Sequence, residues 1–142
     1  MYPMKRRLVF IALFQMSMIL VIAQNSSKPS SYHKLKVYYF YTEERCPIDQ
    51  SVEDNTTKVM QSNFREKIKD GTIDFRIINT DDKANAKLLI GFEINAQALF
   101  IVKVEKGKEV KTDFTKFAFD YGLSNPLKFK KGLKDEIEKN LK

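Results

Sequence analysis

Three short runs of β-branched and aromatic residues predict buried strands. They lie at residues 35–41 (LKVYYFY), 73–79 (IDFRIIN) and 98–105 (ALFIVKVE). The tight turn Lys106-Gly107-Lys108 follows the third run and leads into a fourth strand at 109–113. The last two strands are therefore expected to pair as an antiparallel hairpin.

Between the strands, apolar residues recur with the spacing of a helix. Residues 47–69 are predicted to form one long helix that ends at Asp70-Gly71, and residues 82–92 a short one. A last helix is expected to begin with Asn125 as its N-cap and Pro126 in its first turn. The residues expected to face inward are Ile48, Val52, Val59, Met60, Phe64 and Ile68 in the first helix, Ala84, Leu88 and Leu89 in the second, and Phe129, Leu133, Ile137 and Leu141 in the last.

The predicted elements follow one another in the order β-α-β-α-β-β-α. A helix joins the first two strands, so these strands are expected to be parallel. The hairpin adds two antiparallel strands to the same sheet, and helices cover both of its faces. The sequence therefore predicts an α/β protein, a three-layer α/β/α sandwich around a mixed four-stranded sheet.

The N-terminus has the pattern of a secretory signal peptide. Three basic residues, Lys5 to Arg7, precede an apolar run at residues 8–23, which ends in small residues up to Ala23. The run is shorter than the ~20 residues of a membrane-spanning helix. We expect a signal peptide at residues 1–23 that is cut after Ala23, a periplasmic or secreted protein, and no stable membrane insertion after cleavage. An uncleaved membrane anchor is the alternative.

A polar segment separates the signal peptide from the predicted folded domain. Residues 24–34 (QNSSKPSSYHK) are rich in serine and contain Pro29, which is typical of a flexible linker. His33 lies in this linker, so we do not expect it to be catalytic. The remaining residues, 35–142, are long enough for one domain with its own core.

Composition and charge exclude several classes of site. The chain has 142 residues, 43% of them hydrophobic, and a net charge of +7. Removal of residues 1–23 lowers the net charge from +7 to +4, because that segment has three basic and no acidic residues. A net charge of this size does not indicate a nucleic-acid partner. One Cys and one His cannot form an internal disulfide or a structural zinc site. No phosphate-binding loop or nucleophile elbow is present. We therefore expect neither a metal nor a cofactor.

Cys46 is the strongest candidate for chemistry. It directly follows the first predicted strand and precedes Pro47, the first residue of the longest helix. Backbone N–H groups and the helix dipole at such a position stabilise a thiolate. Arg45 would add to this effect, whereas nearby carboxylates such as Glu44 and Asp49 would oppose it.

A second candidate feature is a cluster of aromatic residues after the hairpin. Phe117, Phe119 and Tyr121 alternate with other residues, which favours an extended segment along the edge of the sheet, and Phe114 lies just before them. Packing under a loop is one interpretation of this cluster. The other is an exposed patch that binds a partner protein.

The order of elements, together with a Cys at the mouth of the first helix, resembles the thioredoxin fold over residues 35–142. Three segments, YYFYTEERCPIDQSVE, INAQALFIV and TKFAFDYGLSNPLKFKKGLKDEI, are similar to an exported thioredoxin-like family of Bacteroidetes, the ArsF-type nitrophenyl compound nitroreductase subunit. The resemblance implies a component of a redox system. Its partner would be another exported redox protein or a catalytic subunit.

The chain departs from the thioredoxin pattern at two positions. Thioredoxin-type exchange uses Cys-x-x-Cys, in which the second thiol resolves the mixed disulfide. Here the motif is Cys46-Pro47-Ile48-Asp49, and Asp49 can cap the helix instead. Thioredoxins also place a cis-proline opposite the Cys. Gln97 and Ala98 occupy that region, so we expect a trans peptide there, because a cis bond before a residue other than proline costs roughly 3 kcal/mol.

These observations support two functional hypotheses. The first is an exported accessory or binding protein of a redox system that lacks dithiol–disulfide activity of its own. The alternative is a monothiol thiol–disulfide oxidoreductase with Cys46 as its lone nucleophile, so the residues leave open whether the protein is an enzyme. A Cys46-linked dimer is a third outcome. Nitroreductase chemistry itself needs an electron carrier such as a flavin, and no site for one is visible in the sequence.

Overall fold

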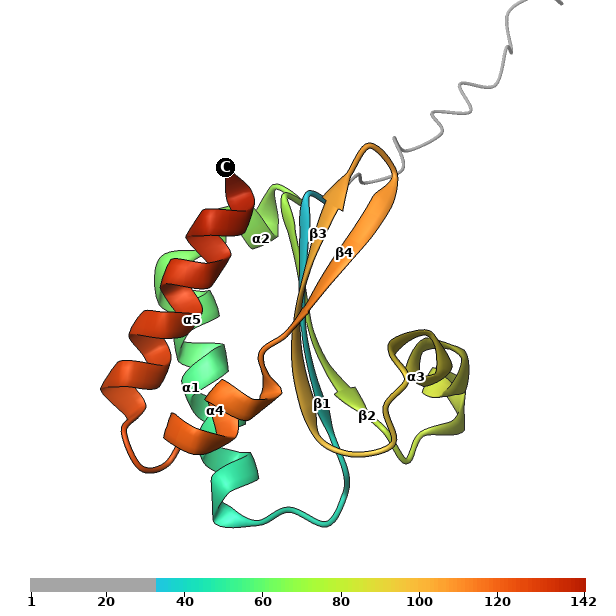
Figure 1. The fold of residues 1–142 in the computed structure, drawn as a ribbon, viewed down its shortest axis with the longest axis vertical. Helices are drawn as coiled ribbons and strands as arrows, with labels where there is room; N and C mark the ends of the chain where they lie inside the picture. Colours follow the sequence, from blue (N-terminus) through green and yellow to red (C-terminus); the bar gives the residue numbers. More distant parts are fainter. Residues whose placement is uncertain (1–32) are drawn as a thin grey trace, which may run out of the picture. The chain divides into compact units, whose positions relative to one another are not determined.

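The computed structural model describes residues 33–142 (Figure 1). The predicted signal peptide and residues 24–32 of the predicted linker lie outside this range. The strands are β1 (Leu35–Tyr41), β2 (Ile73–Asn79), β3 (Ala98–Glu105) and β4 (Lys108–Asp113). The helices are α1 (Pro47–Asn63), α2 (Arg65–Lys69), α3 (Ala86–Phe92), α4 (Thr115–Tyr121) and α5 (Pro126–Leu141), with a 3₁₀ turn η1 (Lys83–Asn85) before α3.

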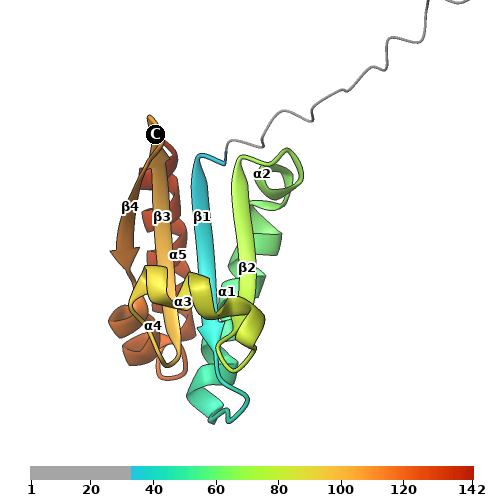
Figure 2. The ribbon, with the colours of Figure 1, turned by 90° about the vertical axis from the view of Figure 1, so that its right-hand side faces the viewer.

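The four strands form one mixed sheet in the order β2-β1-β3-β4 (Figure 2). β1 runs parallel to β2 and antiparallel to β3, with Val37 opposite both Phe75 and Ile101. β3 and β4 form the predicted hairpin. In Figure 1, α1, α4 and α5 cover one face of the sheet and α3 covers part of the other. The predicted three-layer α/β/α architecture is confirmed.

Two hydrophobic clusters lie on the two faces of the sheet because side chains alternate between the faces along each strand. The larger cluster packs α1, α4 and α5 against the sheet. Its fully buried members include Leu35, Val37 and Tyr39 of β1, Leu99 and Ile101 of β3, Val52 and Met60 of α1, and Phe129, Leu133 and Ile137 of α5. The smaller cluster lies under α3 and contains Tyr38, Phe40, Phe92 and Phe100. The Phe92 ring lies 5.1 Å from that of Phe40 and 5.0 Å from that of Phe100.

The prediction of one helix over residues 47–69 is wrong at Phe64. This residue leaves the helical conformation, with φ −127° and ψ 11°, so that α1 ends and α2 begins in a new direction. The side chain of Phe64 is 3% exposed. Burial of this ring offsets the free energy lost where the helix is interrupted. Ile48 was expected to face the core but is 36% exposed. It lies in the first turn of α1, ahead of the buried Val52.

The predicted helix over residues 82–92 is shorter than expected. Asp82 accepts a hydrogen bond from the Ala84 N–H and starts the 3₁₀ turn η1, and α3 proper begins only at Ala86. Ala84 therefore lies exposed in the turn instead of facing inward. Leu88 and Leu89 pack against the smaller cluster as predicted.

The segment after the hairpin is a helix, α4, and the prediction of an extended strand-like segment is wrong. The residues Phe114, Phe117, Ala118 and Tyr121 recur at spacings of three and four, which places them on one side of a helix. Phe117 packs on Phe114 with ring centroids 4.8 Å apart, and on Tyr121 at 4.9 Å. Phe117 and Tyr121, two of the three alternating aromatic residues that suggested a strand, are four residues apart and so also fit a helix.

The folded domain begins slightly before residue 35. The His33 ring nitrogen Nδ1 lies 2.7 Å from the Gly71 carbonyl. The Lys34 N–H donates to the Thr72 carbonyl at 3.0 Å, and the Val104 N–H donates to the Lys34 carbonyl at 2.8 Å. The last two residues of the predicted linker are thus hydrogen-bonded to the turn before β2 and, through Lys34, to β3.

An acidic group on the α3 face of the sheet makes the stability depend on pH. The Tyr38 hydroxyl donates to Asp74 at 2.6 Å, and Arg76 pairs with the same carboxylate at 2.9 Å. Burial disfavours the Asp74 carboxylate, but the hydrogen bonds from Arg76 and Tyr38 outweigh it and lower the pKa of Asp74 below its usual value. Burial, and then the bond to Asp74, raises the pKa of Tyr38, which therefore stays a donor.

Replacing Tyr38 by Phe should lower the free energy of unfolding by about 1 kcal/mol near neutral pH, because a buried hydrogen bond is lost. A carboxylate with a lowered folded-state pKa stabilises the protein above the unfolded value, about 3.9, and this contribution disappears as the pH falls through the folded pKa. The difference between wild type and Tyr38→Phe should therefore narrow in acid. Urea unfolding of wild type and Tyr38→Phe at neutral pH and in acid measures this difference in the free energy of unfolding. Tyr41→Phe is the matched control, because the Tyr41 hydroxyl makes no hydrogen bond within the described residues; a pH-independent Tyr38→Phe effect would contradict the prediction.

Candidate functional site

Cys46 occupies the N-cap position of α1, at the end of the loop that follows β1. Its backbone is extended, with φ −92° and ψ 167°, and Pro47 is the first residue of the helix. Proline suits this position because its missing N–H would have no partner in the first turn and its ring fixes a helical φ. The thiol is free and exposed. The sequence therefore placed Cys46 correctly.

Asp49 caps the same helix and is almost fully buried, at 4% exposed. Its Oδ2 accepts the Cys46 N–H at 2.9 Å, which is the carboxylate half of a capping box. Its backbone carbonyl accepts the Tyr39 hydroxyl at 3.0 Å. Burial, and then the charges of Asp49 and Glu53, raises the pKa of Tyr39, so the phenol remains a donor. The predicted capping role of Asp49 is confirmed.

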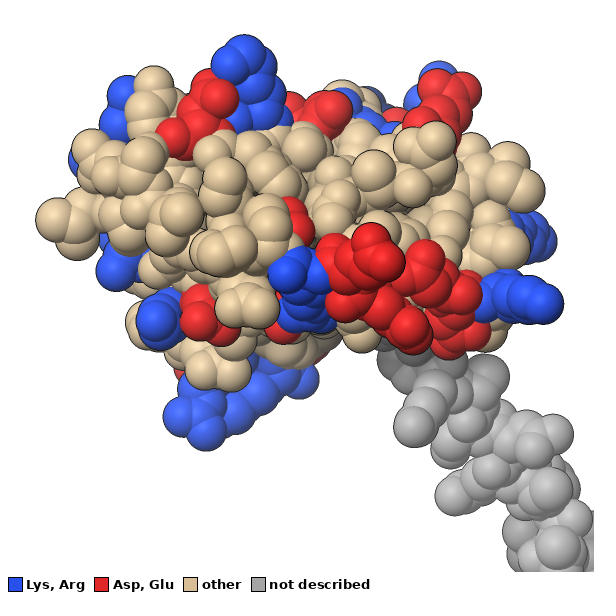
Figure 3. All heavy atoms as spheres, turned by 90° about the horizontal axis from the view of Figure 1, so that it is seen from below, with Lys and Arg blue, Asp and Glu red and all other residues tan. Residues whose placement is uncertain are grey.

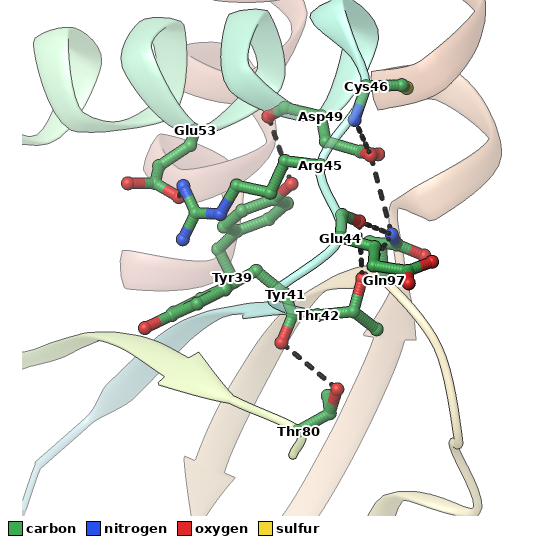
Figure 4. A network of polar contacts seen from close by, with 10 residues as sticks. All are labelled: Tyr39, Tyr41, Thr42, Glu44, Arg45, Cys46, Asp49, Glu53, Thr80 and Gln97. Atoms are coloured by element: carbon green, nitrogen blue, oxygen red, sulfur yellow. Dashed lines mark hydrogen bonds and ion pairs between the residues drawn. The ribbon is translucent and has the colours of Figure 1, made fainter. Parts of the chain in front are cut away.

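Gln97 ties the loop before β3 to the loop that carries Cys46 (Figure 4). Its Nε2 donates to the Thr42 hydroxyl at 2.7 Å and lies 3.4 Å from Oδ2 of Asp49. The next residue, Ala98, is buried and begins β3. Its preceding peptide bond is trans, as are all peptide bonds of residues 33–142, which agrees with the prediction. The region opposite Cys46 is thus braced by an amide side chain.

Arg45 points away from the thiol. Its guanidinium lies 3.8 Å from the centre of the Tyr41 ring and 2.5 Å from a carboxylate oxygen of Glu53. Figure 4 shows the guanidinium and the Cys46 sulfur on different sides of the loop. The positive charge that was expected to assist the thiolate is instead paired with Glu53.

Acidic residues gather beside the Cys46 loop. The Glu43 N–H donates to Asp81 at 2.7 Å, which brings the β1–α1 and β2–η1 connections together. Both residues are exposed, as are Glu44 and Asp82. Figure 3 views the molecule from the end where α1 begins and shows acidic side chains next to a broad area without charged side chains.

Exposed apolar residues lie at the start of α1 and at the turn between α4 and α5. The Gly122 carbonyl accepts hydrogen bonds from Ser51 at 2.7 Å and from Asn55 at 3.1 Å, which holds this turn against α1. The large exposed apolar side chains of these segments are Ile48, Leu123 and Leu127, at 36%, 50% and 76% exposure. We call these three residues the apolar rim. Sequence reasoning missed Leu123 and Leu127, although Leu127 departs from the four-residue spacing of the buried side chains of α5.

The predicted aromatic cluster lies mostly against the core. Phe114, Phe117, Phe119 and Tyr121 are all partly buried and pack on the larger hydrophobic cluster. Phe117 also lies directly against Gly132 of α5: a Cβ added to Gly132 would come within 2.6 Å of its ring. These contacts favour a packing role for the cluster over an exposed patch.

Within residues 33–142, no group of three or more His, Cys, Asp or Glu side chains is arranged to hold a metal ion. Over the same residues, no helix is both long and apolar enough to cross a lipid bilayer. Comparison of the chain with protein-family models and with curated proteins finds no match.

Proposed function

We propose that this protein is an accessory or binding module of an exported redox system, built on a thioredoxin-like scaffold, without dithiol–disulfide activity of its own. The observation that carries the proposal is the environment of Asp49. The residue three positions after Cys46 is a buried carboxylate that caps α1 and contacts Gln97. A resolving thiol would have to occupy that position, and the described residues contain no other cysteine.

The surface around Cys46 supports a binding role. Ile48 of the apolar rim lies in the first turn of α1. Leu123 and Leu127 follow Gly122, whose carbonyl is hydrogen-bonded to α1. Glu43 and Glu44 lie in the Cys46 loop and are exposed. We infer that these exposed apolar side chains belong to a protein–protein contact site, because exposed apolar surface is commonly found at such sites. The partner would be another exported redox protein or a catalytic subunit.

A turnover assay tests the absence of dithiol activity. The purified chain, with a dithiol as reductant, should not accelerate the reduction of insulin disulfides above the rate of Cys46→Ser, the matched variant without a thiol. A rate that exceeds that of Cys46→Ser by about tenfold or more would contradict the proposal, since it would require efficient exchange through one thiol.

The exposure of Cys46 favours a second candidate function, a monothiol oxidoreductase. The Cys46 thiolate would attack one sulfur of a partner disulfide, so that a Cys46–partner S–S bond forms, the partner's S–S bond breaks and its other sulfur leaves as a thiolate. An external thiol would then have to attack the mixed disulfide to release Cys46. This function therefore requires a second thiol molecule in the same compartment.

The alkylation rate of Cys46 separates the two candidates. Because the thiol is exposed and Arg45 is paired with Glu53, the folded protein should react with iodoacetamide within about threefold of the rate of the urea-unfolded chain at pH 6 and pH 8. Reaction more than tenfold faster in the folded state at pH 6 would instead support the monothiol function. A non-reducing gel of the same sample reports any Cys46-linked dimer.

A further inference from the structure

A groove between α1 and α5 concentrates positive charge. It has a volume of about 470 Å³ and is lined by the side chains of four lysines, Lys58, Lys130, Lys131 and Lys134, together with Ser62 and Asn63. None of its lining residues is acidic. Four lysine side chains from two helices thus line one hollow.

The groove differs from the hollow on the opposite face of the sheet, where cations face carboxylates. There, Lys36 pairs with Glu109 and Arg76 with Asp74. In the groove, Lys58 and Lys130 form no ion pair with any residue of 33–142. The positive charge of these two lysines is therefore uncompensated.

The other two lysines are paired only along the exposed side of α5. Lys131 pairs with Asp135 and Lys134 with Glu138, one turn further on in each case. In both pairs the two side chains are more than 40% exposed, and exposed pairs of this kind contribute little stability. Both lysines are thus free to turn toward an anion in the groove at small cost.

The spacing of the cations limits the size of the ligand. Lys130 and Lys134 are one turn apart on α5, and Lys58 and Ser62 are one turn apart on α1, so each pair spans roughly 5–6 Å of helix axis. The Ser62 hydroxyl has no hydrogen-bond partner within the described residues and can donate to an oxyanion. Lysine ammonium groups are common ligands of phosphate, to which they act as point charges. The groove therefore suits a compact ligand with one or two phosphate groups.

We propose that the groove between α1 and α5 binds the phosphate groups of a compact anionic ligand, such as a diphosphate. The site is independent of the function proposed for the Cys46 region, because Lys58 lies twelve residues along α1 from Cys46, roughly 18 Å.

Titration calorimetry with inorganic diphosphate at low ionic strength tests the proposal. Wild type should bind, and binding should weaken as salt is added. The double variant Lys58→Gln/Lys130→Gln removes the two unpaired charges and should weaken binding by about tenfold or more. The matched control, Lys83→Gln/Lys108→Gln, removes two exposed lysines outside the groove and should stay within about twofold of wild type. Absence of diphosphate binding, or equal weakening by the two double variants, would overturn the proposal.

Vesicles identify the source of the phosphate group. If a lipid headgroup supplies the phosphate, wild-type protein should bind to vesicles that contain phosphatidic acid and be retained in the vesicle pellet. This retention should be lost in Lys58→Gln/Lys130→Gln. Retention of wild type and of both double variants alike would assign vesicle binding to overall charge and would contradict a role for the groove. If diphosphate binds but vesicles retain no protein, a soluble phosphate compound is the ligand.

Discussion

Replacing Asp49 by Ala should lower the free energy of unfolding by about 2 kcal/mol. The loss of a helix cap alone costs roughly 0.5–2 kcal/mol. Here the change also leaves the Cys46 N–H without its acceptor at 2.9 Å and removes a contact of Gln97. The carboxylate is 4% exposed, so water cannot readily replace it in the packed site.

Urea unfolding of three variants isolates the role of the Asp49 carboxylate. Asp49→Asn keeps an oxygen that can accept the Cys46 N–H and should lose about half as much as Asp49→Ala. Asp54→Ala, an exposed acidic position on the same helix, should stay within about 0.5 kcal/mol of wild type. If Asp49→Ala is no less stable than Asp54→Ala, the capping role assigned to Asp49 is wrong.

Replacing Gly122 by Ala should lower the free energy of unfolding by about 2–3 kcal/mol, an overpacking effect. A Cβ at this position would lie 2.5 Å from Cγ2 of Val52 and 2.6 Å from the carbonyl oxygen of Ala118. The backbone of Gly122 is right-handed helical, with φ −57°, so the cost is steric and not conformational. The turn between α4 and α5 would have to move away from α1, and its bonds to Ser51 and Asn55 would lengthen.

Thermal and urea unfolding of matched variants test this steric explanation. Gly91→Ala is the control, because an added Cβ there meets nothing within 4 Å and alanine in place of glycine stabilises a helix by roughly 0.5–1 kcal/mol. In a double-mutant cycle, Val52→Ala should recover part of the loss in Gly122→Ala by vacating the contested space. Additive effects of the two substitutions would show that the contact with Val52 is not the cause.

Displacement of the α4–α5 turn should also change the surface near Cys46. Leu123 and Leu127 follow Gly122 closely and form two of the three residues of the apolar rim. The proposed binding function therefore predicts that Gly122→Ala weakens partner binding even where the protein remains folded.

Short-range patterns predicted most of the elements. The bounds of β1, β2 and β3 agree with the predicted strands, because runs of β-branched and aromatic residues flanked by turns favour strands locally. Asn125 and Pro126 marked the start of α5, and the Asn125 side chain accepts the Lys128 N–H as an N-cap. Neighbouring residues, above all Pro47, likewise indicated that Cys46 and Asp49 lie at the start of α1.

Local patterns failed where packing between distant segments decides the conformation. The break at Phe64 depends on burial of its ring in the larger cluster, and no feature of residues 47–69 alone requires it. In the segment after β4, aromatic residues fit both a strand and a helix. The helical conformation is favoured because it packs Phe117 against Gly132 of α5.

The sequence by itself determined the fold class, the strand positions and the place of the only thiol of the chain at the start of a helix. Each of these follows from residues within a few positions of one another. Only the tertiary structure decided what surrounds that thiol. Gln97, 48 residues away from Asp49 in the sequence, contacts its carboxylate, and Glu53 forms an ion pair with Arg45. The lysines of α1 and α5 likewise meet only after the helices pack. Such contacts depend on how the sheet orders its strands, a property of the whole folded chain.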